Sequence, residues 1–172
     1  MITKLLSIEE VNNLISEHFI KIFGNVVEHS TSAAIGILKY RPFSNSKDIQ
    51  FAINEYLDSL KCSDKEKILQ AHPDMVCKLT DLSRLLLEYE VNIHGYSETN
   101  RPSVEEKLKL KELNRMYIKK FGFPFITFKK LNFFEIFSEL ERRVANSKEK
   151  EIILSMTEVK KICNMKVLEI VL

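Results

Sequence analysis

The stretch Phe121-Gly122-Phe123-Pro124-Phe125-Ile126 marks the end of a helix and the start of an extended aromatic segment. Gly122 is a typical residue for ending a helix. The residues from Phe123 to Phe128 would suit a β-strand, but the chain offers no second strand to pair with them, so we expect a buried loop. Amides and carbonyls in such a loop need partners when they are buried. The loop can therefore be plain core, or it can hold a flat polar ligand such as a ureide.

The remainder of the chain is patterned for helices. Gly and Pro number four each among 172 residues, so few positions interrupt the helical segments. Three Ser-x-x-Glu sequences, which begin at Ser7, Ser63 and Ser103, predict capping boxes at helix starts. No convincing sheet is present. We therefore expect an all-α protein with a single domain over residues 1–172, made of about eight helices.

Apolar spacing places the individual helices. The Ser7 box should open one helix that continues to Gly24, with His18 on its apolar side. Further helices are expected from Val76 to Tyr89, from Leu131 to Val144, and from Ile152 to Ile170 at the end of the chain. An irregular loop should separate Val91 from Asn100.

Composition excludes several classes of protein. Hydrophobic residues at 45% and charged residues at 29% are ordinary for a globular protein, and no apolar run is long enough to span a bilayer. Basic residues between Lys107 and Lys120 alternate with glutamates, which indicates a solvated helix face and no nucleic-acid partner. Cys62, Cys77 and Cys163 show no metal-binding spacing, so we expect free, buried thiols and no metal site.

His72 is the strongest candidate for chemistry. It follows the helix that the Ser63 box should open, and Pro73 disfavours helical geometry at His72 and so ends that helix. Asp74 is placed to cap the next helix. An imidazole that titrates near neutral pH can donate and accept protons. The plain alternative is a histidine at a helix end with no chemical role.

These residues resemble the family of 2-oxo-4-hydroxy-4-carboxy-5-ureidoimidazoline (OHCU) decarboxylases. The resemblance rests on His72-Pro73-Asp74-Met75, on Leu113-Asn114 with Tyr117, and on Phe121 through Ile126. Further matching pieces cover nearly the whole chain in order: Phe23-Gly24-Asn25-Val26-Val27-Glu28, Ser32-Ala33-Ala34-Ile35, Tyr40-Arg41-Pro42-Phe43 and Glu158-Val159-Lys160-Lys161-Ile162-Cys163. The family is all-α, needs no cofactor and is usually homodimeric.

The resemblance implies an activity and a set of site residues. The activity is decarboxylation of the ureidoimidazoline to (S)-allantoin in urate degradation. His72 would be the catalytic acid and base, and Pro73 would shape the pocket beside it. The backbone around Phe121, Gly122, Phe123, Phe125 and Ile126 would bind the ureide and ring amides.

Two further substrate contacts follow from positions where the sequence differs from the family pattern. The family's Glu-Gln element aligns without a gap with Ile93-His94, and Glu90 can supply the carboxylate if the loop shifts. The family's arginine in the last helix corresponds to Lys166, which keeps the charge but lacks the two-pronged fork that matches a carboxylate.

An alternative from a different functional class stays open. The chain could be a divergent relative that has lost turnover and serves as a ureide-binding or protein-interaction module. For either function we expect a small-molecule ureide ligand and no nucleic-acid or membrane partner, and the resemblance implies a homodimer. The resemblance implies a peroxisomal location. The cytoplasm is the alternative, because Glu169-Ile170-Val171-Leu172 is not a peroxisomal signal.

Overall fold

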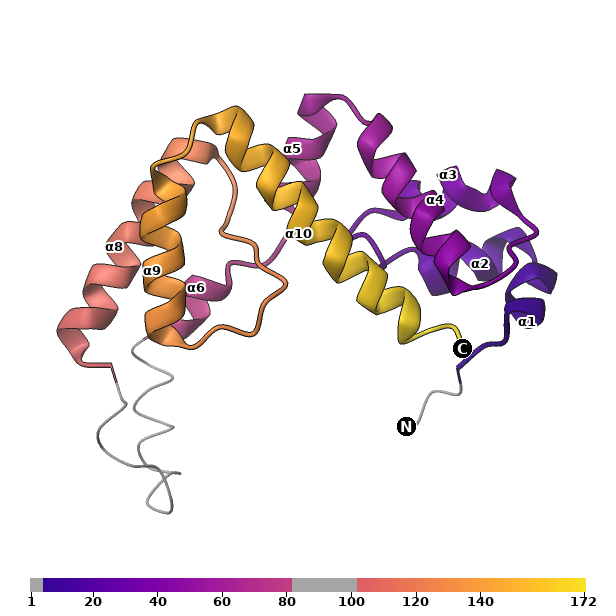
Figure 1. Ribbon diagram of the computed structural model, residues 1–172, viewed down its shortest axis with the longest axis horizontal. Coiled ribbons are helices and arrows are strands. Elements are labelled where there is room, and N and C mark those ends of the chain that lie inside the picture. The colour runs from indigo at the N-terminus through magenta and orange to yellow at the C-terminus, as the bar shows by residue number, and fades with distance from the viewer. Residues whose placement is uncertain (1–4, 82–101) are drawn as a thin grey trace, which may run out of the picture. The chain divides into compact units, whose positions relative to one another are not determined.

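The computed structural model describes residues 5–81 and 102–172, whose elements are shown in Figure 1. The described elements are α1 (Ile8–Asn13), α2 (Ser16–Phe23), α3 (Thr31–Ile37), the short 3₁₀ helix η1 (Leu38–Tyr40), α4 (Ser46–Ser59), α5 (Cys62–Gln70), α6 (Met75–Leu79), α8 (Val104–Phe121), α9 (Phe133–Val144) and α10 (Lys148–Leu168). Within these ranges no β-strand forms, and Leu6 and Val171 make an isolated parallel bridge. The predicted all-α architecture of about eight helices is confirmed.

The chain divides into two compact units. Unit 1 consists of Met1–His72, Ile126–Phe128 and Ile152–Leu172, and unit 2 of Pro73–Phe125 and Lys129–Glu151. The helix α10 therefore begins in unit 2 and continues in unit 1. The assignment of one domain stays a prediction, because compact units are not by themselves independently folding domains.

Aromatic rings form the centre of unit 1. The ring of Phe19 stacks on those of Phe23 and Phe43, at centroid distances of 4.5 and 6.3 Å. The guanidinium of Arg41 lies 5.2 Å from the centroid of Phe19. The apolar residues of this core are closed to solvent, as the zero exposure of Phe19 shows.

The predicted single helix from Ser7 to Gly24 is wrong in its middle. Its capping box is present, because Ser7 Oγ accepts from the amide of Glu10 at 3.2 Å and Glu10 Oε2 accepts from the amide of Ser7 at 2.7 Å. However, α1 ends at Asn13, and Leu14 is extended. The Leu14 carbonyl accepts a hydrogen bond from Arg41 Nη1 at 2.5 Å, a long-range contact that has no local signal in the sequence.

This break also corrects the placement of His18. The helix α2 starts afresh at Ser16, and its buried residues are Phe19 and Phe23. His18 is exposed, although the sequence pattern placed it on an apolar face. The pattern failed because it continued the helical phase of α1 through two extended residues.

The Ser63 capping box is also wrong. The helix α5 already begins at Cys62, and Lys61 occupies the N-cap position without a side-chain hydrogen bond. The connection from α4 is only Leu60 and Lys61, both extended, so Ser63 is already inside the first turn. The box at Ser103 is confirmed, with Glu106 as its partner.

The cysteine prediction is partly wrong. All three thiols are free, as expected, and Cys163 is buried, but Cys62 and Cys77 are exposed.

Unit 2 contains two helices that lie side by side, α8 and α9 (Figure 1). Near their ends, Lys120 Nζ donates to the carbonyl of Val144 at 2.7 Å. The helix predicted from Leu131 to Val144 is confirmed as α9, which Asn132 caps. The helix predicted from Val76 to Tyr89 is wrong in its extent, because α6 ends at Leu79 and neither Thr80 nor Asp81 is helical; residues 82–89 lie outside the described residues.

None of the helices in the described ranges has the length and apolarity that a bilayer crossing requires. The basic residues of α8 are solvated as predicted. Lys109 pairs with Glu105 and Arg115 with Glu112, and all four side chains are exposed.

Candidate functional site

His72 lies in unit 1, directly after the end of α5. The residue is 8% exposed, and Nδ1 lies 2.8 Å from the carbonyl oxygen of Ile68. Because a carbonyl can only accept, Nδ1 carries a proton, and Nε2 is the nitrogen that exchanges protons. The turn therefore fixes both the orientation and the tautomer of the imidazole.

Two oppositely charged side chains of unit 1 act on this ring. Lys166, in the last turn of α10, donates through Nζ to Glu28 Oε2 at 2.6 Å and to the carbonyl of Asn25 at 3.1 Å. The side chains of Glu28 and Lys166 are 20% and 26% exposed. Glu28 lies between α2 and α3, so the pair joins the two ends of the unit's sequence.

The electrostatics of the three groups are coupled. Burial lowers the pKa of His72, and the charge of Lys166 lowers it further, while the Ile68 hydrogen bond and Glu28 work in the opposite direction. Burial alone would raise the pKa of Glu28, but the hydrogen bond and charge of Lys166 outweigh it, and the pKa is lowered. At neutral pH the site thus holds a neutral imidazole beside a carboxylate–ammonium pair.

The aromatic loop of unit 2 begins at a left-handed glycine that ends α8. Gly122 adopts φ 85°, a left-handed conformation, and its amide donates to the Ile118 carbonyl at 2.8 Å. The ring of Tyr117 meets the rings of Phe121, Phe123 and Phe125 edge-on, at centroid distances of 4.7, 6.3 and 5.9 Å. The predicted extended, buried loop is confirmed from Phe123 to Ile126, which are buried and belong to no strand, but it is wrong at Phe128, which is 41% exposed.

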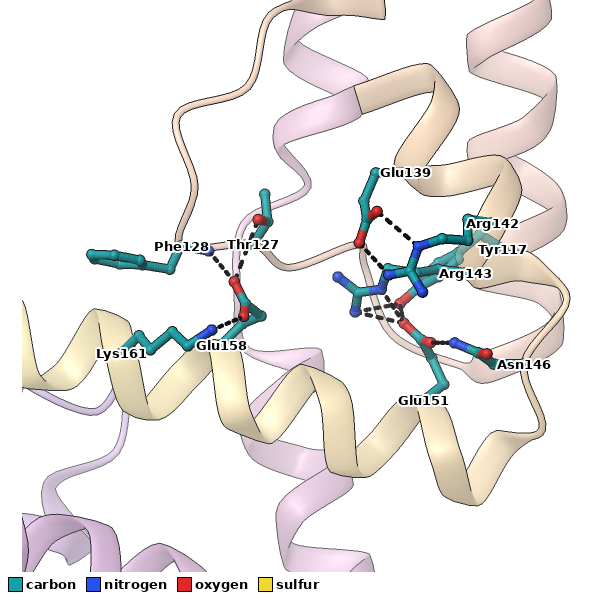
Figure 2. Close-up of polar contacts among 10 residues, drawn as sticks. All are labelled: Tyr117, Thr127, Phe128, Glu139, Arg142, Arg143, Asn146, Glu151, Glu158 and Lys161. Carbon is teal, nitrogen blue, oxygen red and sulfur yellow. Dashed lines mark hydrogen bonds and ion pairs between the residues drawn. The ribbon is translucent and has the colours of Figure 1, made fainter. Parts of the chain in front are cut away.

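A buried polar cluster supports this loop (Figure 2). Glu151 is fully buried, and its Oε1 accepts from the hydroxyl of Tyr117 at 2.5 Å and from Arg143 Nε at 2.7 Å. Its Oε2 accepts from Asn146 Nδ2 at 2.7 Å. The guanidinium of Arg143 also lies 4.7 Å from the ring centroid of Phe125. The cluster therefore joins the loop to α8, α9 and the first turn of α10.

A second carboxylate holds the segment that follows the loop. In unit 1, Glu158 Oε2 accepts from the amide of Phe128 at 2.8 Å and from the hydroxyl of Thr127 at 3.4 Å (Figure 2). Lys161 Nζ donates to Glu158 Oε1 at 2.7 Å. A charged acceptor thus takes backbone and side-chain donors that no helix uses.

The turn after His72 is anchored in unit 2. As predicted, Asp74 caps α6, since its Oδ1 accepts from the amide of Cys77 at 2.8 Å. Asn114, on α8, donates through Nδ2 to both carboxylate oxygens of Asp74, at 2.9 and 3.2 Å. Asp74 therefore joins the start of α6 to α8.

The predicted site residues fall in both units. His72, Ile126 and Lys166 belong to unit 1, whereas Pro73 and the residues from Phe121 to Phe125 belong to unit 2. Lys166 is paired with Glu28, and the charges of both side chains act on the His72 imidazole. The sharing of one pocket by His72 and the aromatic loop stays a prediction. Glu90, Ile93 and His94 lie outside the described residues.

Sequence reasoning missed Glu28 as the partner of Lys166 and as a charge that acts on His72, and it missed the buried charges of α10. A signal for the latter was present. Glu151, Ser155 and Glu158 follow one another at spacings of four and three residues, which places them on one helix face. All three are buried. Polar residues at core-facing positions of an amphipathic helix indicate a buried hydrogen-bonding network.

Two other possible kinds of site lie away from these residues. Among the described residues, no group of three or more His, Cys, Asp or Glu side chains is arranged to hold a metal ion. A hollow in the surface of unit 1 contains no predicted site residue, and it is lined by Tyr40, Pro42, Phe43, Asp48, Phe51, Ala52 and Glu55.

The chain is similar to known proteins over nearly its whole length. A family profile described as OHCU decarboxylase matches residues 12–167. The 2-oxo-4-hydroxy-4-carboxy-5-ureidoimidazoline decarboxylase of Amia calva is 33% identical over 172 residues, which covers 96% of this chain and 95% of that protein.

Solved structures share the fold. A crystal structure of (S)-allantoin synthase matches with a TM-score of 0.77 at 20% identity, covering 96% of this chain, which spans 54% of that chain. A crystal structure of an OHCU decarboxylase in the presence of (S)-allantoin matches with a TM-score of 0.61 at 20% identity, covering 82% of this chain and 91% of that chain.

Proposed function

Since this chain belongs to the OHCU decarboxylase family, we propose that it removes carbon dioxide from 2-oxo-4-hydroxy-4-carboxy-5-ureidoimidazoline to give (S)-allantoin in urate degradation. The enzyme is then a carbon–carbon lyase. The structural observation that carries the proposal is the His72 ring, which is almost closed to solvent and held by one hydrogen bond to Ile68.

The orientation of His72 suits proton transfer. With Nδ1 bound to the Ile68 carbonyl, Nε2 can take a proton from the substrate and return one. Burial lowers the pKa of His72, so the imidazole is neutral at pH 7 and ready to act first as a base. A fixed ring also delivers its proton to one face of the substrate, as a single enantiomer requires.

The substrate itself accepts the electron pair. When its carbon–carboxylate bond breaks, carbon dioxide leaves, and the electron pair moves into the neighbouring C=N bond of the ring. A proton then adds to one face of the ring carbon that becomes the stereocentre of allantoin. For each ionised substrate, one proton is taken up overall. The protein has to position the groups and move that proton, which one imidazole can do.

The remaining site residues act in binding. We assign the ring and ureide amides to the backbone from Phe121 to Ile126, and the substrate carboxylate to Lys166. The contacts around the loop support this role, because the Tyr117 ring and the Arg143 guanidinium both pack against the loop's phenylalanines and hold them in place. Donors fixed before binding stabilise charge on the substrate without reorganising. Glu90 is the proposed source of the protein carboxylate that contacts the substrate.

The test is a direct assay on the full chain. Substrate is generated freshly from urate by the two upstream activities, and the handedness of the allantoin is followed by circular dichroism. We expect the (S)-enantiomer to form faster than in the absence of the protein. Racemic product at the uncatalysed rate would reject the activity. Ligand binding without turnover would instead favour a ureide-binding relative.

Assembly and location are further proposals from the family resemblance. We expect a homodimer, which light scattering after size-exclusion chromatography would show as twice the mass of the chain. A peroxisomal location is proposed, with the cytoplasm as the alternative, and the position of the fluorescently tagged full chain in cells would decide between them.

A further inference from the structure

We propose that Glu28 is a positioning residue of this site: its carboxylate holds the Lys166 ammonium in place and balances that charge beside the His72 imidazole. The catalytic meaning of this arrangement rests on the proposed function of His72. The arrangement itself is a matter of charges and distances within unit 1, and it can be tested without turnover.

Glu28 is positioned as the counterion of Lys166. Its Oε2 accepts the Lys166 ammonium at 2.6 Å, and the same ammonium donates to the Asn25 carbonyl at 3.1 Å. Asn25 and Glu28 belong to one short segment, so this segment supplies two hydrogen-bond acceptors to the Lys166 ammonium. The four-carbon stem of a lysine is otherwise free to rotate. Losing the carboxylate would leave the ammonium with a single neutral acceptor among these contacts.

Solvent shields this pair only in part. The side chains of Glu28 and Lys166 are 20% and 26% exposed, whereas the surface pair of Lys109 and Glu105 is 62% and 78% exposed. Interactions between charges strengthen as the surroundings become less water-like. The charge on Glu28 is therefore felt at His72 more strongly than a surface carboxylate would be.

Besides the Ile68 carbonyl, the charged groups that act on His72 come from the segment after α2 and from α10. From the segment after α2, Glu28 favours the charged imidazolium and His29 opposes it. From α10, Lys166 opposes it. Cys163, also on α10, is buried, and burial raises the pKa of its thiol to about 12, so it carries no charge at neutral pH. Asp74, which follows His72 in the sequence, binds Cys77 and Asn114.

One consequence distinguishes this role from a merely structural one. With Glu28 ionised, the carboxylate opposes the effect of the Lys166 ammonium on the imidazole, and this favours protonation of His72. Without Glu28, the positive charge of Lys166 acts alone and opposes protonation. Removing Lys166 has the opposite effect. The two changes therefore shift the titration of His72 in opposite directions, which general loosening of the fold would not do.

The experiment is a nuclear magnetic resonance titration of His72 in the full chain, with its signal assigned by its disappearance in His72→Asn. We expect Glu28→Gln to lower the pKa of His72 by about half a unit or more, and Lys166→Met to raise it. The double variant should return toward the wild-type value. Glu28→Asp keeps the negative charge, so the pKa of His72 should stay close to its wild-type value in that variant.

Asp58→Asn is the matched control, because it breaks the ion pair between Asp58, on α4, and Lys160, which lies on α10 as Lys166 does. This variant should leave the His72 titration unchanged. An unchanged or raised pKa in folded Glu28→Gln would overturn the proposal. If the expected shifts occur but the wild-type chain makes no allantoin, the proposed function fails while the role of Glu28 as counterion stands.

Discussion

Arg143 and Glu151 form an ion pair that is closed to solvent, with Nη2 of Arg143 lying 2.5 Å from Oε1 of Glu151 and side-chain exposures of 1% and 0%. The Tyr117 hydroxyl and the Asn146 amide complete the partners of the carboxylate (Figure 2). A buried charge is tolerated when it is paired and hydrogen-bonded. Because Tyr117 and Arg143 also contact the phenylalanines of the loop, this pair positions the loop as well as stabilising unit 2.

Removing one partner of this pair should be costly. Arg143→Met leaves the charge of Glu151 buried, so we expect the free energy of unfolding to fall by about 3–5 kcal/mol. Urea denaturation measures the loss. The matched control is Arg142→Met, because the neighbouring Arg142 makes a similar pair with Glu139, at 2.6 Å, but is 56% exposed. That variant should lose less than about 1 kcal/mol. Equal losses would contradict the special status of the buried pair.

Gly122 should be sensitive to substitution for a backbone reason. Its φ of 85° lies in the left-handed region, which costs other residues about 1–2 kcal/mol. We expect Gly122→Ala to lower the melting temperature, and Gly122→Asn to do so less, because Asn tolerates this conformation better. Lys119→Ala, in the exposed last turn of the same helix, serves as control. An alanine variant as stable as wild type would argue against the strain.

His72→Asn should abolish decarboxylation and preserve the fold. The expected loss in kcat is about 100-fold or more, because a positioned general acid–base group contributes at least that much. The measurement is the stereospecific allantoin assay, with far-ultraviolet circular dichroism as the check on folding. His18→Asn, at an exposed position of α2, is the control and should retain activity. Undiminished turnover in His72→Asn would reject the role of the imidazole.

The stability of the protein should depend on pH through His72. Burial lowers its pKa below the ordinary 6.5, so the unfolded chain binds more protons at this residue than the native state does. The free energy of unfolding therefore falls as pH drops below about 6.5, and levels off below the native pKa. The carboxyl of Glu28 has its pKa below the ordinary 4.5, so its effect appears at lower pH.

Denaturation in urea at a series of pH values, for wild type and His72→Asn, would check this. In His72→Asn, the free energy of unfolding should no longer fall as the pH drops just below 6.5. Parallel curves for the two proteins would show that other groups cause the dependence.

Lys166→Arg should improve substrate affinity if Lys166 contacts the substrate carboxylate. A guanidinium offers two parallel donors where an ammonium offers a point charge. We expect a lower KM with kcat little changed. Lys160→Arg, elsewhere on α10 and paired with Asp58, is the control and should leave KM unchanged. An unchanged or higher KM in Lys166→Arg would count against the contact.

Local signals in the sequence predicted local structure well. The capping boxes at Ser7 and Ser103, the cap of α6 by Asp74 and the helix end at Gly122 all depend on atoms within four residues of one another, and all are present. The failure at Ser63 has a different cause. The two-residue connection from α4 starts α5 early, and this overrides a capping pattern that is otherwise correct.

The sequence by itself determined the all-α class, most helix ends, the unpaired aromatic loop and the candidate imidazole. Only the tertiary structure decided that Arg41 interrupts the first helix at Leu14, that Glu151 is a fully buried acceptor, and that Glu28 meets Lys166 across 138 positions of the chain. The physical reason is that helix caps depend on neighbouring residues, whereas the partners of a buried ion pair are the distant side chains that the fold brings within about 3 Å, and no local pattern identifies those partners.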